Sequence, residues 1–110
     1  MTKKRLIKEC KKYEKTADYT YSDTDVILEA DGYLLIYQPA TIGNIVFLKI
    51  SDNHKYTLLQ VVKYFSEWLY LKYDVKIVTI KNKKWKYIMN KLKELQLIYE
   101  NDEYCIYVRD

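Results

Sequence analysis

Glycine and proline are scarce in this chain, which has two glycines and one proline among 110 residues. Backbone N–H groups approach a bound phosphate most closely where no Cβ intervenes, so phosphate-binding loops are usually rich in glycine. The scarcity excludes the glycine-rich loops of P-loop and dinucleotide-binding proteins. Linkers rich in glycine or proline are also missing, and the length suits one hydrophobic core, so we expect a single domain.

Histidine and cysteine are scarce as well. His54 is the single histidine, and Cys10 and Cys105 are nearly a chain length apart. A structural zinc site needs about four ligands, so no metal site is predicted. Each cysteine falls on an apolar stripe, which predicts two buried thiols in a reducing compartment. No serine elbow or zinc-binding helix occurs, and we assign no catalytic residue.

Long apolar runs are absent too. No run approaches the roughly 18–20 residues that span a bilayer, so we expect no membrane association. The basic start, Met1–Arg5, is not followed by an apolar stretch, so we expect no secretory signal peptide.

Tyrosine and lysine are abundant, with 13 tyrosines and a net charge of +4. Codons for lysine, isoleucine, tyrosine and asparagine are AT-rich, which indicates an AT-rich genome such as that of a low-GC bacterium, its phage or a plasmid. Charge is segregated: residues 1–17 are mainly basic, residues 18–31 are acidic, and Lys81–Lys93 contains lysines without an acid. A basic face attracts nucleic acid or an acidic partner, although solvation of amphipathic helices is the simpler explanation.

Apolar periodicity predicts one α+β domain with a mixed sheet. We expect a helix over 3–16, a short helical turn through 26–28, strands over 33–37 and 45–50 joined by a hairpin loop, a helix over 57–73, a strand over 75–80, a helix over 85–95, and a closing hairpin of 97–99 and 104–108. Because a helix separates strand 75–80 from strand 45–50, a parallel crossover is expected.

The segment Asp52–Thr57 lies between an apolar strand and a helix N-terminus, a common place for a bound phosphate. It contains no glycine. His54 would need an orienting partner and a nucleophile to act as a general base, and the sequence indicates neither. We therefore expect an exposed loop histidine.

From about Asp31 to its end, the chain resembles the core of the GNAT family of N-acetyltransferases. Asp31–Tyr37 resembles that family's second strand, and Ile45–Ile50 resembles the strand that leads to the acetyl-CoA pyrophosphate loop. Val75–Ile80, followed by Asn82 and a helix, resembles the part that packs along the cofactor. The resemblance implies a GNAT-like mixed sheet flanked by helices, with residues 1–30 as a helical N-terminal part and 31–110 as the sheet and two main helices.

The departures from the family pattern concern activity. The family's loop reads Arg/Gln-x-x-Gly-x-Gly/Ala, and Asp52–Thr57 has neither glycine. Counting from Asn82, Trp85 takes the position of the family's alanine and Met89 that of the tyrosine that acts as general acid. The resemblance thus implies a GNAT-like fold that binds no acetyl-CoA, similar to small phage-encoded internal virion proteins. Such a protein would bind a protein partner or a second copy of itself, in the host cytoplasm or the virion.

Two alternatives remain open. In the first, the chain is an active N-acyltransferase whose divergent loop binds acetyl-CoA through Asn53, His54, Lys55, Tyr56, Thr57 and Asn82. In the second, residues 82–108 form a winged-helix-like DNA-binding end, and phosphates contact Lys81, Lys83, Lys84, Lys86 and Lys91. This segment lacks side chains spaced for base readout, and a minimal winged helix has no place for the strands before Ser51.

Overall fold

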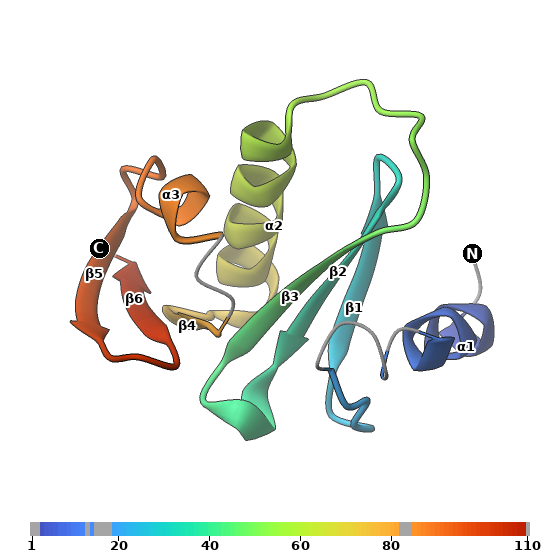
Figure 1. Cartoon of the computed structure of the whole chain (residues 1–110), viewed down its shortest axis with the longest axis horizontal. Coiled ribbons are helices and arrows are strands. Elements are labelled where there is room, and N and C mark those ends of the chain that lie inside the picture. Colours follow the sequence, from blue (N-terminus) through green and yellow to red (C-terminus); the bar gives the residue numbers. More distant parts are fainter. Residues whose placement is uncertain (1–2, 13, 15–18, 82–84, 110) are drawn as a thin grey trace.

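The computed structural model describes residues 3–12, 14, 19–81 and 85–109, which form an α+β fold with a six-stranded mixed sheet (Figure 1). The helical elements are α1 (Lys3–Lys12), η1 (Pro39–Thr41), α2 (Leu58–Tyr73) and α3 (Lys86–Met89). The strands are β1 (Val26–Ala30), β2 (Tyr33–Gln38), β3 (Asn44–Lys49), β4 (Ile77–Ile80), β5 (Leu95–Glu100) and β6 (Cys105–Arg109). Their order across the sheet is β1-β2-β3-β4-β6-β5.

Two antiparallel units make up the sheet, β1-β2-β3 and β4-β6-β5. They meet where β3 and β4 pair in parallel at Asn44 and Thr79, and the Thr79 amide donates to the Gly43 carbonyl at 3.0 Å. Helix α2 makes the crossover between these two strands. The parallel crossover expected from the sequence is therefore confirmed.

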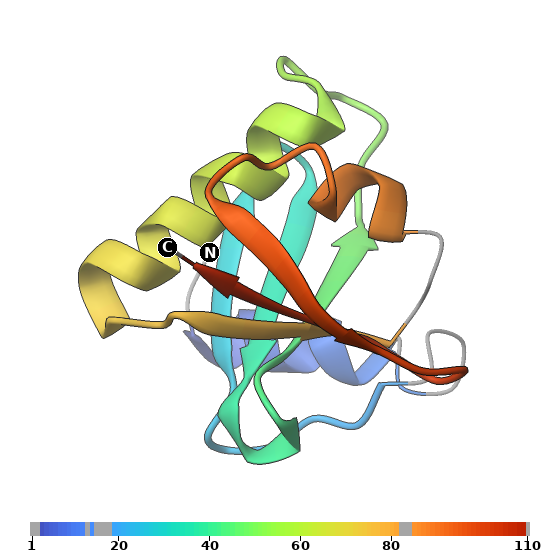
Figure 2. The same cartoon turned by 90° about the vertical axis from the view of Figure 1, so that its left-hand side faces the viewer.

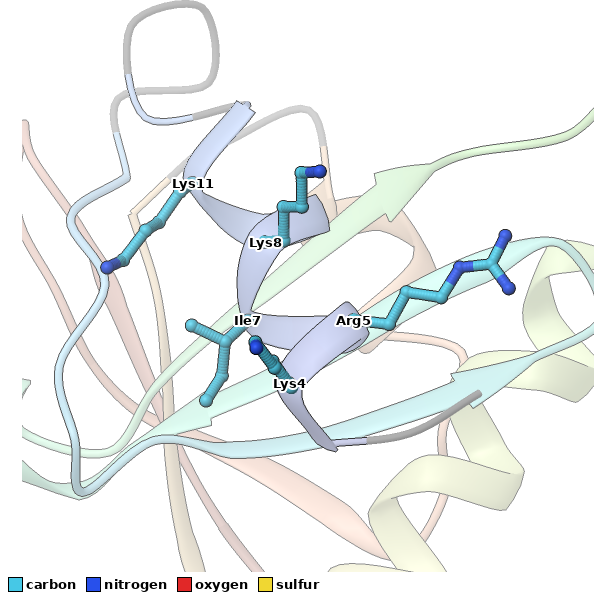
Figure 3. Close-up of a pocket in the computed structure, with 5 residues that line it drawn as sticks. All are labelled: Lys4, Arg5, Ile7, Lys8 and Lys11. Atoms are coloured by element: carbon cyan, nitrogen blue, oxygen red, sulfur yellow. The ribbon is translucent and has the colours of Figure 1, made fainter.

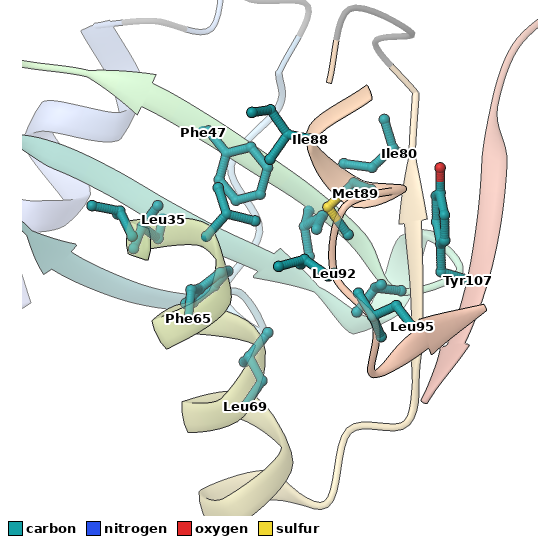
Figure 4. Packing of buried hydrophobic residues seen from close by; sticks show 14 of the residues in the cluster. Leu35, Phe47, Phe65, Leu69, Ile80, Ile88, Met89, Leu92, Leu95 and Tyr107 are labelled. Atoms are coloured by element: carbon teal, nitrogen blue, oxygen red, sulfur yellow. The ribbon is translucent and has the colours of Figure 1, made fainter. Parts of the chain in front are cut away.

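The sheet is covered on both faces, because the side chains of a strand point alternately to opposite sides. Leu35 of β2 belongs to the larger core, which α2 and α3 cover, whereas its neighbours Leu34 and Ile36 belong to a smaller core with Cys10 of α1. Figure 4 shows the larger core, with Phe65 and Leu69 of α2 and Met89 of α3 among its members. Figure 2 shows α1 and α2 on opposite sides of the sheet.

Helix α2 begins and ends as the sequence predicts. The Thr57 side chain accepts a hydrogen bond from the Gln60 amide, and the Gln60 side chain accepts one from the Thr57 amide, which together form a capping box. At the other end, Asp74 adopts a left-handed conformation with φ 55° and closes the last turn.

The segment 26–28 forms strand β1, so the expected helical turn is wrong. Asp31 and Gly32 both have positive φ values, 51° and 81°, and make the tight turn that folds β1 back on β2. Ile27 packs against the core under α1, while Val26 and Leu28 pack against the larger core. This alternation stabilises a strand and would be lost in a helix.

The helix expected over 85–95 is also wrong in extent, since α3 is a single turn. Beyond Met89, the amides of Lys91 and Leu92 donate to carbonyls three residues back, and β5 begins at Leu95. The apolar residues at helical spacing (Ile88, Met89, Leu92 and Leu95) are all buried, but they belong to a helical turn, a loop and a strand. Helix α1 spans Lys3–Lys12, and residues 13, 15 and 16 of the expected first helix lie outside the described residues. The closing hairpin is confirmed as β5 and β6.

Candidate functional site

The loop between β3 and α2 packs against the turn between β1 and β2. The amides of Ile50 and Ser51 both donate to the Gly32 carbonyl, at 2.8 and 3.1 Å. Lys49 and Asp52 form an exposed ion pair at 2.7 Å, and the Asn53 amide donates to the Ser51 hydroxyl. The loop is therefore held by local contacts at its start and by the opposite turn along its length.

The carboxylate of Asp31 occupies the place where an anion would bind this loop. One carboxylate oxygen accepts the Lys55 amide at 2.7 Å, and the other accepts the Tyr56 amide at 3.0 Å. These two hydrogen bonds, from Lys55 first and Tyr56 second, hold the pKa of the Asp31 carboxyl below its ordinary value. A side chain of the protein itself thus binds backbone donors just before the N-terminus of α2.

His54 lies behind this contact and fills the space under the turn. Its Nδ1 lies 2.6 Å from the Asp31 carbonyl oxygen, and its ring stacks on Tyr33 with 4.7 Å between centroids. The Nε2 atom is buried and has no hydrogen-bond partner among the described residues. The expected exposed histidine is therefore wrong, because the ring is half-buried between two turns. A Cβ on Gly32 would lie 3.1 Å from this ring, so the glycine leaves room for it.

The residues expected to bind acetyl-CoA in the acyltransferase alternative are used in these internal contacts. The backbone amides of this loop already donate to acceptors of the chain. The Asn53 amide donates to Ser51, the Lys55 and Tyr56 amides donate to Asp31, and the Thr57 amide donates to Gln60. Asn82 lies outside the described residues. Met89, at the position of the family's general acid, is fully buried, and a thioether has no proton to donate.

A groove of about 480 Å³, which sequence patterning does not predict, opens beside Asp31. It is lined by Ala30, Asp31, Tyr56, Gln60, Val61 and Tyr64. Tyr56 and Tyr64 are 60% and 54% exposed, and Leu71 further along α2 is 82% exposed. The outer side of α2 therefore presents apolar area to solvent.

Of the described lysines expected to contact phosphates, Lys86 and Lys91 are engaged by other side chains of the chain. Lys86 pairs with Glu100 at 2.6 Å, and Lys91 lies over the Tyr87 ring. Lys81 is exposed, and Lys83 and Lys84 lie outside the described residues.

Helix α1 carries several cationic side chains close together. Four cationic side chains surround Ile7 and line an open hollow of about 510 Å³, as Figure 3 shows. They are Lys4, Arg5, Lys8 and Lys11. These side chains lie on one side of a helix whose other side packs on the sheet, so α1 presents a basic surface to solvent.

Both cysteines are buried, as predicted, and neither forms a disulfide; burial raises the pKa of the Cys10 thiol to about 11. Among the described residues, no group of three or more histidine, cysteine or acidic side chains is arranged to hold a metal ion. The described helices are all too short or too polar to cross a membrane. Comparison of the chain with protein-family models, with curated proteins and with solved structures finds no match.

Proposed function

We propose that this protein is a GNAT-like domain that transfers no acetyl group and acts as a binding or structural protein, encoded by a phage and working in the virion or the host cytoplasm. The observation that carries this proposal is the Asp31 carboxylate bound to the Lys55 and Tyr56 amides. An acetyl-CoA pyrophosphate on this loop would have to displace a negatively charged side chain from the same donors.

Further observations bear on the proposal. From β2 onward the elements are two strands, a helix, a strand, a single helical turn and a closing hairpin, which is the order of the resemblance except that its last helix is reduced to one turn. Within that order, Met89 replaces a proton donor by a buried thioether, and Phe47 and Trp85 pack edge to face at 5.3 Å where the strand and the last helix approach each other. The one position where the resemblance implies a general acid is thus occupied by a buried apolar side chain.

Titration calorimetry of the full chain with acetyl-CoA tests the proposal. We expect no saturable heat at millimolar ligand and no acetyl transfer to an amine acceptor. Tight, saturable binding together with acetyl transfer would contradict it and would favour the divergent acyltransferase. In that case the double variant Asn53→Ala/His54→Ala would bind acyl-CoA more weakly than the parent.

A nucleic-acid-binding role is a second candidate, favoured by the cationic hollow on α1. Neutralising phosphates with lysines releases counterions, so binding of duplex DNA would weaken steeply as salt rises. The variant Lys4→Ala/Lys8→Ala would lower both the affinity and the salt dependence, whereas Lys72→Ala on α2 would change neither. Absent or salt-insensitive binding rules this candidate out. A thermal-shift panel with acetyl-CoA, DNA and buffer compares both roles under one condition.

A further inference from the structure

Strand β5 is an open edge of the sheet. It stands at the end of the strand order and pairs only with β6 among the described strands, so one side of its backbone has no partner strand. Figure 2 shows β5 and β6 nearest the viewer, with no described element outside them except the loop from α3. Unpaired backbone donors and acceptors along an edge can pair with a strand of another chain.

The side chains of β5 do little to protect this edge. All residues of the strand after Leu95 are exposed, and three successive apolar residues are among them. These are Leu97, Ile98 and Tyr99, with exposed fractions of 36%, 55% and 49%. Natural edge strands usually carry a lysine, a proline or a bulge that prevents pairing with another chain. Strand β5 has no lysine or proline, and its pairing with β6 has one irregularity, between Leu97 and Tyr99.

The opposite edge provides a comparison within the same sheet. In β1, Glu29 is the exposed residue and the others are half-buried, because α1 and the larger core cover them from the two sides. Both edge strands have one side of the backbone without a partner among the described strands, but β5 differs from β1 in that the side chains along it are exposed and include three successive apolar ones.

Apolar surface continues from β5 onto the adjoining strands. Register places Tyr99 beside Ile106 and places Val108 beside Ile77, all on the face of the sheet opposite α2. Ile77 is 49% exposed, and Tyr99 contacts Tyr104 with 5.9 Å between ring centroids. Pairing at the edge would therefore also bring apolar side chains together on this face.

Charge at the two ends of β5 indicates the orientation of the partner. Exposed Lys93 precedes the strand, and exposed Asp102 and Glu103 follow it. If a second β5 pairs antiparallel about a centre near Leu97 and Ile98, Lys93 of each copy lies opposite Asp102 and Glu103 of the other. A parallel pair would place like charges together, which is unfavourable across strands.

We infer that this protein forms a symmetric dimer in which two β5 strands pair antiparallel and join two six-stranded sheets into one. Such an interface is isologous, since each copy contributes the same strand and the same charged ends. The inference deepens the proposed binding role by naming a second copy as partner. The dimer interface contains no residue of the His54 loop. A negative result in the dimer measurement therefore contradicts only the dimer, and acetyl-CoA binding in the calorimetry contradicts only the proposed absence of acetyl transfer.

Sedimentation equilibrium of the full chain over a range of concentrations measures the dimer. We expect a reversible monomer–dimer equilibrium and at least a tenfold rise in its dissociation constant on Ile98→Lys. The matched control is Leu71→Lys, which adds the same charge at an exposed apolar position on α2 and should change the constant less than twofold. A parent chain that stays monomeric, or a dimer that Leu71→Lys weakens as much as Ile98→Lys, overturns the inference.

A charge exchange tests the antiparallel arrangement with variants whose folding is not at risk, because all three positions are exposed. Lys93→Glu alone, and Asp102→Lys/Glu103→Lys alone, should each weaken the homodimer at both ends. A mixture of the two variants should form a heterodimer in which both ends attract, with a dissociation constant close to that of the parent. The measurement is made at low salt, where charges are least screened. If the mixture dimerises no better than either variant alone, the antiparallel arrangement is wrong. That result is expected if the true partner of β5 is a strand of another protein.

Discussion

The substitution Gly43→Ala should be among the most damaging single changes in this protein, because Gly43 lies where the two halves of the sheet meet. Its φ is +68°, and a Cβ there would stand 2.8 Å from the backbone carbonyl oxygen of Ile77. A residue with a side chain in the left-handed region costs roughly 1–2 kcal/mol. Separating two backbones in a packed interior adds about 1–3 kcal/mol. Together these give an expected loss of about 2–5 kcal/mol of the free energy of unfolding.

Gly32→Ala is the matched control, since Gly32 also has a positive φ, 81°, but its nearest neighbours are side-chain atoms of His54 and Ser51 at 3.1–3.2 Å. Side chains yield more easily than backbone, so we expect a loss of about 1–2 kcal/mol. Urea unfolding followed by far-ultraviolet circular dichroism gives both values. A loss below about 1 kcal/mol for Gly43→Ala, or an equal loss for the two variants, would refute the close approach of β3 and β4.

Four further outcomes are expected. Thr57→Ala removes the cap of α2 and should cost about 1 kcal/mol, or 4–8 °C in melting temperature, whereas Thr57→Ser should cost far less. Ile42, 61% exposed with φ 53°, is strained, so Ile42→Asn should raise the free energy of unfolding by about 1 kcal/mol while Ile42→Val leaves it unchanged. The pKa of the Asp31 carboxyl is lower in the folded state than in the unfolded state, so the ionised carboxylate stabilises the fold above the unfolded pKa. This stabilisation is lost as pH falls through the folded pKa, and Asp31→Asn should therefore flatten the acid side of a plot of stability against pH. Ellman's reagent should react with Cys10 and Cys105 only after unfolding, and fast reaction of the native protein would contradict their burial.

Sequence patterning predicts the elements whose apolar period and boundaries agree. Helix α2 has a capping residue, a long apolar stripe and a clear end, and β2 and β3 flank a loop marked by proline and glycine. The parallel crossover followed from the helix between β3 and β4. Each of these predictions rests on local signals that the tertiary structure does not override.

The errors arise where one local pattern suits two structures. Ser22 and Asp25 can cap a helix, but in the turn before β1 the Asp25 side chain accepts the Ser22 amide and the Asp25 amide donates to the Ser22 carbonyl. The stripe from Ile88 to Leu95 marks buried residues correctly but has the wrong backbone, because a one-turn helix and a strand bury the same side chains. Periodicity identifies which residues are buried more reliably than it identifies the element that contains them.

The candidate site could be located from the sequence but its internal contacts could not. The segment before α2 stood out as a helix N-terminus without glycine, and its backbone donors do bind an anion. That anion is Asp31, more than 20 residues earlier, and the sequence marked it only as a turn residue. No spacing rule joins two loops that meet only after two strands have paired, so the contact had to come from the fold.

The positions of backbone groups without a hydrogen-bond partner help to distinguish a protein-binding role from a cofactor-binding role. Enzyme and cofactor sites usually gather polar donors at a concave surface, where a ligand completes their hydrogen bonds. Here the donors near the α2 N-terminus, on Lys55 and Tyr56, are completed by the chain itself. Backbone groups without a partner strand instead lie along β5, next to exposed apolar side chains. Because an extended row of backbone donors and acceptors suits another strand better than a small molecule, this distribution favours a protein partner over a nucleotide cofactor.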